Sequence, residues 1–105
     1  MKTFHVIITK SAQIDIEEIY NYITYTLLAP ENASKQINRI FKELKNLQTL
    51  PNRHPLHDKE PWKSKGLRKV IIDNFLAFYL VNEQTEEVII LHVYYCGRNV
   101  NELLK

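Results

Sequence analysis

The chain has 105 residues, the size of a single domain that buries roughly 65% of the surface its unfolded form exposes. Hydrophobic residues make up 45% and charged residues 25%, which is typical of globular proteins and excludes a disordered or fibrous one. The formal net charge is only +2. No apolar run reaches the about eighteen residues that span a bilayer, so an integral membrane protein is also excluded. We expect one domain over residues 1–105.

The cysteine and histidine content argues against a disulfide bond and against a metal site. Cys96 is the only cysteine, so no intramolecular disulfide is possible. His54 and His57 lie close together in sequence but have no further Cys or His around them to complete a metal site. Phosphate-cradling glycine loops are missing too, so we expect neither metal nor cofactor. The apolar run in residues 1–10 is too short for a signal peptide, which predicts a cytoplasmic protein.

The N-terminal third predicts a strand and a helix. Residues 4–8 alternate in hydrophobicity with a period of two, which indicates a short strand with His5 facing outward. Thr9 or Ser11 can cap a helix that begins near Ser11. This helix should end before Pro30. Its apolar stripe recurs at steps of three and four and comprises Ile16, Ile19, Tyr20, Ile23 and Leu27.

A second helix follows after a short connection over residues 28–32. Asn32 is a candidate N-cap, and Pro51 should end the helix. The short connection forces the two helices into an antiparallel hairpin with both apolar stripes facing the same way. The second stripe comprises Ala33, Ile37, Ile40, Phe41, Leu44 and Leu47.

The segment 51–64 contains three prolines and no periodicity, so it predicts an irregular crossover. Trp62 should cover the edge of the core, with a cation–π contact to a neighbouring lysine. Over residues 58–69, basic side chains outnumber Asp58 and Glu60, which favours an anionic partner, although a solvated loop would show the same charges. The basic residues are Lys59, Lys63, Lys65, Arg68 and Lys69.

Three strands are predicted over residues 67–72, 75–81 and 88–95. Asp73-Asn74 suits a tight hairpin turn, and the nearly continuous apolar run 75–81 indicates a central strand covered on both faces. The element order is βααβββ, an α+β domain in which a helical hairpin packs on one face of an antiparallel sheet. The first strand should pair at an edge of this meander.

Arginines, lysines and tyrosines gather at the ends of this sheet and suit phosphate recognition. In a metal-free ribonuclease, a cation stabilises the pentacoordinate phosphate while a second group removes the 2′-hydroxyl proton. Each residue also has a structural interpretation: Arg68 can pair with a carboxylate such as Asp73, and Tyr95 can be a half-buried strand tyrosine. If the protein is a ribonuclease, the candidate catalytic residues are Arg68, Arg98, His54, Lys65 and Tyr95.

The pattern as a whole resembles the RelE/ParE superfamily of toxins from type II toxin–antitoxin systems. The resemblance covers nearly the whole chain. Its specific parts are the Leu-Arg that opens the second strand, the aromatic-x-x-Phe-Tyr of residues 75–79, and Tyr-x-Gly-Arg-Asn near the C-terminus. It implies a growth-inhibiting toxin in a hetero-oligomer with a cognate antitoxin, whose disordered or helical tail orders on binding.

The resemblance leaves two targets open. RelE-like and YafQ-like members cleave mRNA on the ribosome, whereas ParE-like members inhibit DNA gyrase and are not enzymes. RelE-type ribonucleases usually carry an arginine where this sequence has Leu76, and often a tyrosine where Leu104 aligns. These differences favour the ParE-like function, with the endonuclease as the alternative. A third possibility is a non-toxic binding module with the same fold.

Overall fold

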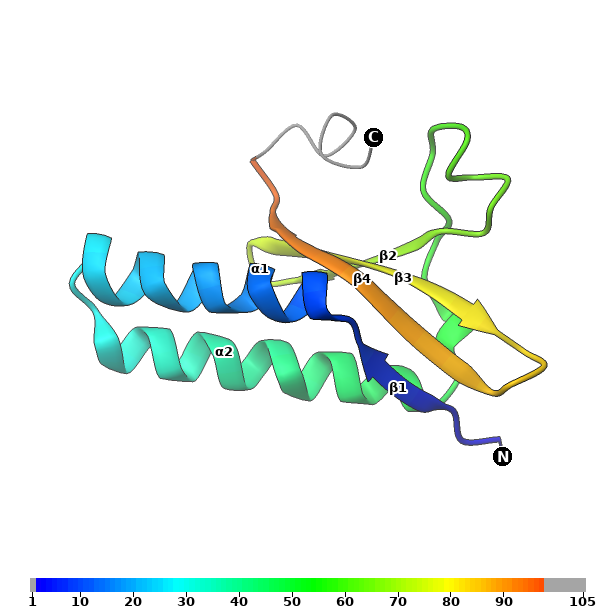
Figure 1. Cartoon of the computed structure of the whole chain (residues 1–105), viewed down its shortest axis with the longest axis horizontal. Helices are drawn as coiled ribbons and strands as arrows, with labels where there is room; N and C mark the ends of the chain where they lie inside the picture. The colour runs from blue at the N-terminus through cyan, green and yellow to red at the C-terminus, as the bar shows by residue number, and fades with distance from the viewer. Residues whose placement is uncertain (1, 98–105) are drawn as a thin grey trace.

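The computed structural model describes residues 2–97 and shows a four-stranded sheet with a helical hairpin on one face (Figure 1). The predicted α+β class and βααβββ order are confirmed. In chain order the elements are β1 (His5–Ile8), α1 (Lys10–Asn21), α2 (Pro30–Lys45), β2 (Arg68–Ile72), β3 (Phe75–Asn82) and β4 (Glu87–Tyr95). Within residues 2–97, no helix is both long and apolar enough to cross a membrane.

The sheet has the strand order β1-β4-β3-β2. Strands β2, β3 and β4 form the predicted antiparallel meander, and β1 lies at its edge as expected. The direction of β1 differs from the prediction, because it pairs parallel to β4, from His5 opposite Glu87 to Ile8 opposite Ile90. The sheet is therefore mixed. Parallel pairing requires a long crossover, and the helical hairpin with β2 and β3 provides it.

A β-bulge in β4 changes which side chains face the helices. Phe78 of β3 is opposite His92, whereas the next residue, Tyr79, is opposite Ile90, so Leu91 is the extra residue. Val88 and Ile90, before the bulge, belong to the helix-facing core, and the next residue of β4 in this core is Val93, three positions further on. The strict period of two is broken at this point.

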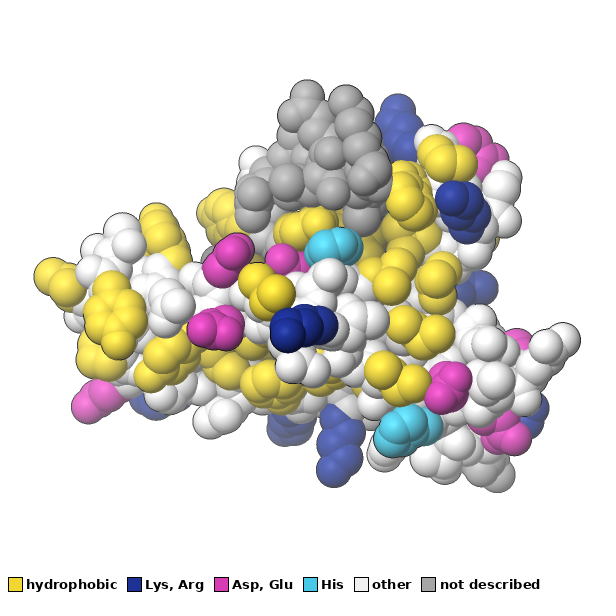
Figure 2. Space-filling view, in the orientation of Figure 1, with side chains coloured by type: hydrophobic (Ala, Val, Ile, Leu, Met, Phe, Trp, Pro, Cys, Tyr) yellow, Lys and Arg dark blue, Asp and Glu magenta, His cyan; other side chains and the backbone are white. Residues whose placement is uncertain are grey.

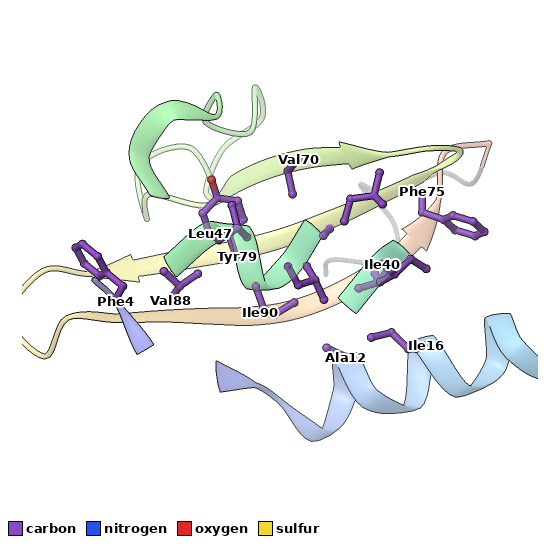
Figure 3. Packing of buried hydrophobic residues seen from close by; sticks show 14 residues of the cluster. Phe4, Ala12, Ile16, Ile40, Leu47, Val70, Phe75, Tyr79, Val88 and Ile90 are labelled. Carbon is purple, nitrogen blue, oxygen red and sulfur yellow. The ribbon is translucent and has the colours of Figure 1, made fainter. Parts of the chain in front are cut away.

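The core has two parts, one on each face of the sheet. The larger part lies between the sheet and the helices, where Ile16, Ile40 and Tyr79 are buried together (Figure 3). The smaller part, on the opposite face, contains Phe78 and is covered by Trp62 of the crossover loop. Both Phe78 and Tyr79 are fully buried, which confirms that β3 is covered on both faces.

The structure confirms the predicted N-cap of the first helix and contradicts the predicted N-cap of the second. The Thr9 hydroxyl accepts a hydrogen bond from Ala12 N at 3.2 Å, so Thr9 is the N-cap of α1, as one of the two predicted candidates. The prediction of Asn32 as the cap of α2 is wrong, because Pro30 is already the first helical residue. Proline suits that position, since it has no N–H to satisfy and its φ is fixed near the helical value.

The outer end of the hairpin projects past the sheet (Figure 1). There α1 continues into a π-helical turn over Tyr22–Thr26, with Leu27 N donating to Tyr22 O at 3.1 Å. A π turn takes more residues than an α turn, so the four-residue step from Ile23 no longer places Leu27 on the same stripe. Leu27 is 55% exposed, which corrects its assignment to the buried stripe. In α2, Phe41 is also exposed, at 43%.

Candidate functional site

An apolar groove of about 560 Å³ lies between the outer half of the first helix and the end of the sheet. One wall comes from α1 and the π turn, through Ile19, Tyr22 and Leu27. The other wall comes from the start of β3 and the end of β4, through Phe75 and Tyr95. The groove exists because the hairpin extends beyond the strands that cover its inner half.

The side chains around this groove are unusually exposed for their type. Tyr22 and Tyr95 are 56% and 53% exposed, and at the tip of the hairpin Tyr25 and Leu28 reach 71% and 80%. Figure 2 shows hydrophobic side chains gathered over this end of the hairpin. Leu28 also has a φ of 53°, a left-handed conformation that a non-glycine residue rarely adopts. Contiguous exposed apolar surface of this kind marks an interaction site.

A polar contact closes the inner end of the groove. Asp15 Oδ2 on α1 accepts a hydrogen bond from Val93 N at 3.1 Å and lies 2.8 Å from His92 Nδ1. The His92 ring stacks on Tyr94 with centroids 4.9 Å apart. Asp15 therefore fixes α1 to the edge of β4 just beyond the point where β1 ends. The sequence gives no sign of this pair, since residues so distant in sequence leave no spacing signal.

A second polar contact holds the β2–β3 turn against α2. Arg39 Nε and Nη2 donate to the two carboxylate oxygens of Asp73, each at 2.7 Å, and Gln36 donates to Asp73 Oδ2 at 3.0 Å. These hydrogen bonds, with Arg39 contributing most, lower the pKa of Asp73 to about 2. Asp73 has a φ of 55°, as expected for the predicted tight turn. Its partner is Arg39, not Arg68.

Two of the predicted ribonuclease residues come together at the other end of β2. Arg68 Nη1 donates to the backbone carbonyl of His54 at 2.7 Å. The His54 ring makes an edge contact with Tyr79, with centroids 6.4 Å apart. Burial, and secondarily the charge of Arg53, lowers the pKa of His54. The guanidinium of Arg68 thus holds the crossover loop by binding the main-chain carbonyl of His54.

The remaining predicted site residues lie elsewhere. Lys65 Nζ sits 5.0 Å from the centre of the Trp62 ring, which confirms the predicted cation–π contact. Arg68 is opposite Tyr79 on β3, whereas Tyr95 is opposite Phe75, four residues away, or roughly 13 Å along the strand. Arg98 lies outside the described residues. The structure therefore does not collect Arg68, His54, Lys65 and Tyr95 into one site, and their catalytic role stays a prediction.

Over residues 2–97, no group of three or more His, Cys, Asp or Glu side chains is placed to hold a metal ion. His57 is 2% exposed, and its ring packs edge-on against Phe78 with centroids 5.7 Å apart. It is a core residue on the smaller side of the sheet.

Comparison with known proteins identifies the fold. The chain is similar to the chromosomal ParDE system of P. aeruginosa, with a TM-score of 0.72 and 26% identity over 89% of this chain and 96% of that one. It is similar to the RelBE2 complex of Mycobacterium tuberculosis, with a TM-score of 0.64 and 16% identity over 90% and 93%. It also resembles the RelE–RelB complex of Pyrococcus horikoshii OT3, with a TM-score of 0.61 and 16% identity over 91% and 98%.

The RelBE2 and RelE–RelB structures share only 16% identity with the chain, so these two similarities show the fold alone. No curated protein matches the sequence. The family described as "ParE toxin of type II toxin-antitoxin system, parDE" matches residues 6–100, which is nearly the whole chain. The chain therefore belongs to the ParE toxin family of type II toxin–antitoxin systems.

Proposed function

We propose that this protein is a growth-inhibiting toxin that acts on DNA gyrase in the cytoplasm and is neutralised by an antitoxin. The family match over residues 6–100 is the observation that carries the proposal. Two further observations support the gyrase target over mRNA. The identity to the ParDE structure exceeds that to the RelBE2 structure, 26% against 16%. Two of the described ribonuclease candidates, Arg68 and Tyr95, also lie four residues apart along β3, opposite Tyr79 and Phe75.

The apolar groove supports the antitoxin part of the proposal. It is long and open along a helix, and a partner helix with apolar side chains on one face would bury Tyr22, Leu27 and Tyr95. Asp15 and Glu18 line the same groove, which favours a basic residue at one end of the partner helix. The similar structure from M. tuberculosis is a toxin–antitoxin complex, and the one from P. horikoshii is a RelE–RelB complex. We place the antitoxin segment in this groove.

The gyrase proposal is tested with the purified chain in a DNA supercoiling assay. The expected result is inhibition that increases with toxin concentration and disappears when the antitoxin encoded beside the gene is added. Induction in cells should stop growth and activate DNA-damage signalling. Normal supercoiling at a saturating concentration of the toxin would contradict the proposal.

The same cells test the endonuclease alternative. A ribonuclease would stop translation and leave mRNA cut within codons, and Arg98→Ala would relieve both effects. The gyrase toxin leaves mRNA intact while growth stops. A chain that is harmless under strong induction would be a binding module with the same fold.

A further inference from the structure

The crossover loop between the helices and β2 has a compact hydrogen-bonded turn over residues 59–66. Lys63 N donates to Lys59 O at 2.9 Å, and Lys65 N donates to Pro61 O at 3.2 Å. Glu60 accepts two hydrogen bonds from Ser64, from its N at 2.8 Å and its Oγ at 2.6 Å. The backbone of the loop is therefore held in one conformation by its own hydrogen bonds.

The base of the loop is attached to the core of the protein. Leu67 N donates to Trp62 O at 3.0 Å, and Leu67 itself is fully buried beside Phe78. Leu67 O in turn accepts a 2.7 Å hydrogen bond from His57 N. In Figure 1 the loop lies at the opposite end of the molecule from the outer ends of α1 and α2, and the groove is lined by the outer half of α1. A partner on the loop and an antitoxin in the groove would occupy separate surfaces.

The loop carries more basic than acidic side chains. Lys59, Lys63 and Lys65 are all exposed, and within residues 2–97 none of them forms an ion pair within 4.0 Å. Two acidic residues offset part of this charge: Glu60 is hydrogen-bonded to Ser64 and attracted by Lys63, and Asp58 lies 3.7 Å from Lys69 and is attracted by Lys59. Figure 2 shows both basic and acidic side chains in the region where Figure 1 draws this loop. The surface offers several ammonium groups to an anion with repeated charges.

The aromatic residue of the loop decides what kind of polyanion fits. Single-stranded RNA is usually held by bases stacking on exposed aromatic rings. Here Trp62 packs against the smaller core, and Lys65 lies over its ring. The neighbouring Phe78 and Tyr94 are buried. A cationic surface without a stacking platform fits a duplex, whose phosphates are evenly spaced and whose bases stay paired.

We propose that residues 59–65 form a contact surface for the phosphate backbone of duplex DNA. Lys59 and Lys63 are joined through an i to i+4 hydrogen bond and so lie on one side of the turn, with Lys65 following. The contact is independent of base sequence. Its role, holding the toxin against the DNA on which gyrase works, rests on the proposed function, whereas the contact itself does not.

The test measures binding of a fluorescein-labelled 20-base-pair duplex by anisotropy between 25 and 200 mM salt. Wild-type binding should be weak, with Kd on the order of 10⁻⁵ M near 50 mM salt, and should weaken steeply as salt rises. The K59A/K63A/K65A variant should lower the slope of log K against log salt by about 2 to 3, since each phosphate contact contributes about 0.9. Affinity at 50 mM salt should fall at least tenfold.

A matched control removes three exposed lysines from α2 in the variant K35A/K42A/K45A, which loses the same net charge. The control should keep the wild-type slope. If Lys65→Ala disturbs the fold through Trp62, the K59A/K63A variant retains that contact and should lower the slope by about 2. Equal slopes for loop and control variants would overturn the inference, as would tighter binding of a 20-nucleotide single-stranded RNA than of the duplex.

The gyrase assay separates this inference from the proposed function. If the wild type leaves supercoiling unchanged but binds the duplex through the loop, the gyrase target is wrong and the DNA contact stands. If the wild type inhibits gyrase while the loop variant binds the duplex as tightly as the wild type, the DNA contact alone is wrong.

Discussion

The hydroxyl of Tyr79 donates a 2.6 Å hydrogen bond to the backbone carbonyl of Pro51. Tyr79 is fully buried in the central strand β3, and Pro51 is buried where the chain leaves the second helix. Burial raises the pKa of Tyr79 to about 12, so the hydroxyl stays protonated and able to donate. The contact joins the start of the crossover loop to the middle of the sheet.

Replacing Tyr79 with phenylalanine tests this contact. The change keeps the ring and leaves the Pro51 carbonyl buried without a donor, which should lower the free energy of unfolding by about 1 to 3 kcal/mol. Urea denaturation followed by circular dichroism measures it. Tyr25→Phe is the matched control, because Tyr25 is 71% exposed and its change should stay within about 0.5 kcal/mol. Equal stability of the two variants would show that the contact contributes nothing.

Acid stability should depend on Asp73. Its folded-state pKa of about 2 lies below the ordinary value near 3.9, so folding favours the ionised carboxylate. The resulting stabilisation is fully present above about pH 4 and is lost as pH falls through about 2. Asp73→Asn removes it while tolerating the left-handed φ of 55°. The difference in Tm between wild type and variant should be constant from pH 5 to 7 and shrink towards pH 2.

Arg39→Gln provides the control for the acid prediction, since Arg39 is the largest cause of the low pKa of Asp73. In the Arg39→Gln background, adding Asp73→Asn should change Tm much less than it does in the wild type. A full effect of Asp73→Asn in that background would mean that the turn itself, and not the ion pair, is responsible.

The Asp15 contact should be needed for packing of α1 on β4. Asp15→Ala leaves Val93 N without its acceptor and His92 Nδ1 without its carboxylate neighbour. We expect a loss of about 1 to 3 kcal/mol in the free energy of unfolding. Glu17→Ala, two residues away on the exposed side of the helix, should stay within about 0.5 kcal/mol. Hydrogen exchange at Val93 should accelerate only in the Asp15 variant.

Antitoxin affinity should depend on the exposed apolar side chains of the groove. Leu27→Ser removes a side chain that the antitoxin helix would bury, which should weaken binding at least tenfold, because burying a leucine contributes about 1.5 to 3 kcal/mol. Titration calorimetry with the antitoxin encoded beside the gene measures this. The stability of the free toxin should barely change, since Leu27 is 55% exposed.

Ile71→Ser is the control for the groove prediction. Ile71 is 70% exposed on the edge strand β2 and does not line the groove. Its replacement should leave antitoxin affinity unchanged. If both variants weaken binding equally, the antitoxin covers the sheet edge as well, and the groove is not its principal site.

The sequence by itself determined which segments became helices and strands. The positions of the helices and strands, the tight turn at Asp73 and the cap at Thr9, one of two candidates, were predicted because neighbouring residues decide them. The basic crossover loop, with Trp62 at the edge of the core, was also predicted, since the composition of this segment alone indicates it. Membership of the toxin superfamily followed from the pattern of the last three strands.

Only the tertiary structure decided how these elements assemble into surfaces. The parallel pairing of β1, the bulge at Leu91 and the contact between Asp15 and His92 depend on residues far apart in the chain, which no local pattern encodes. The groove depends on where the sheet stops covering the hairpin. An apolar residue such as Leu27 has the same sequence signal whether a strand covers it or solvent does, and only the extent of the sheet distinguishes core from binding surface.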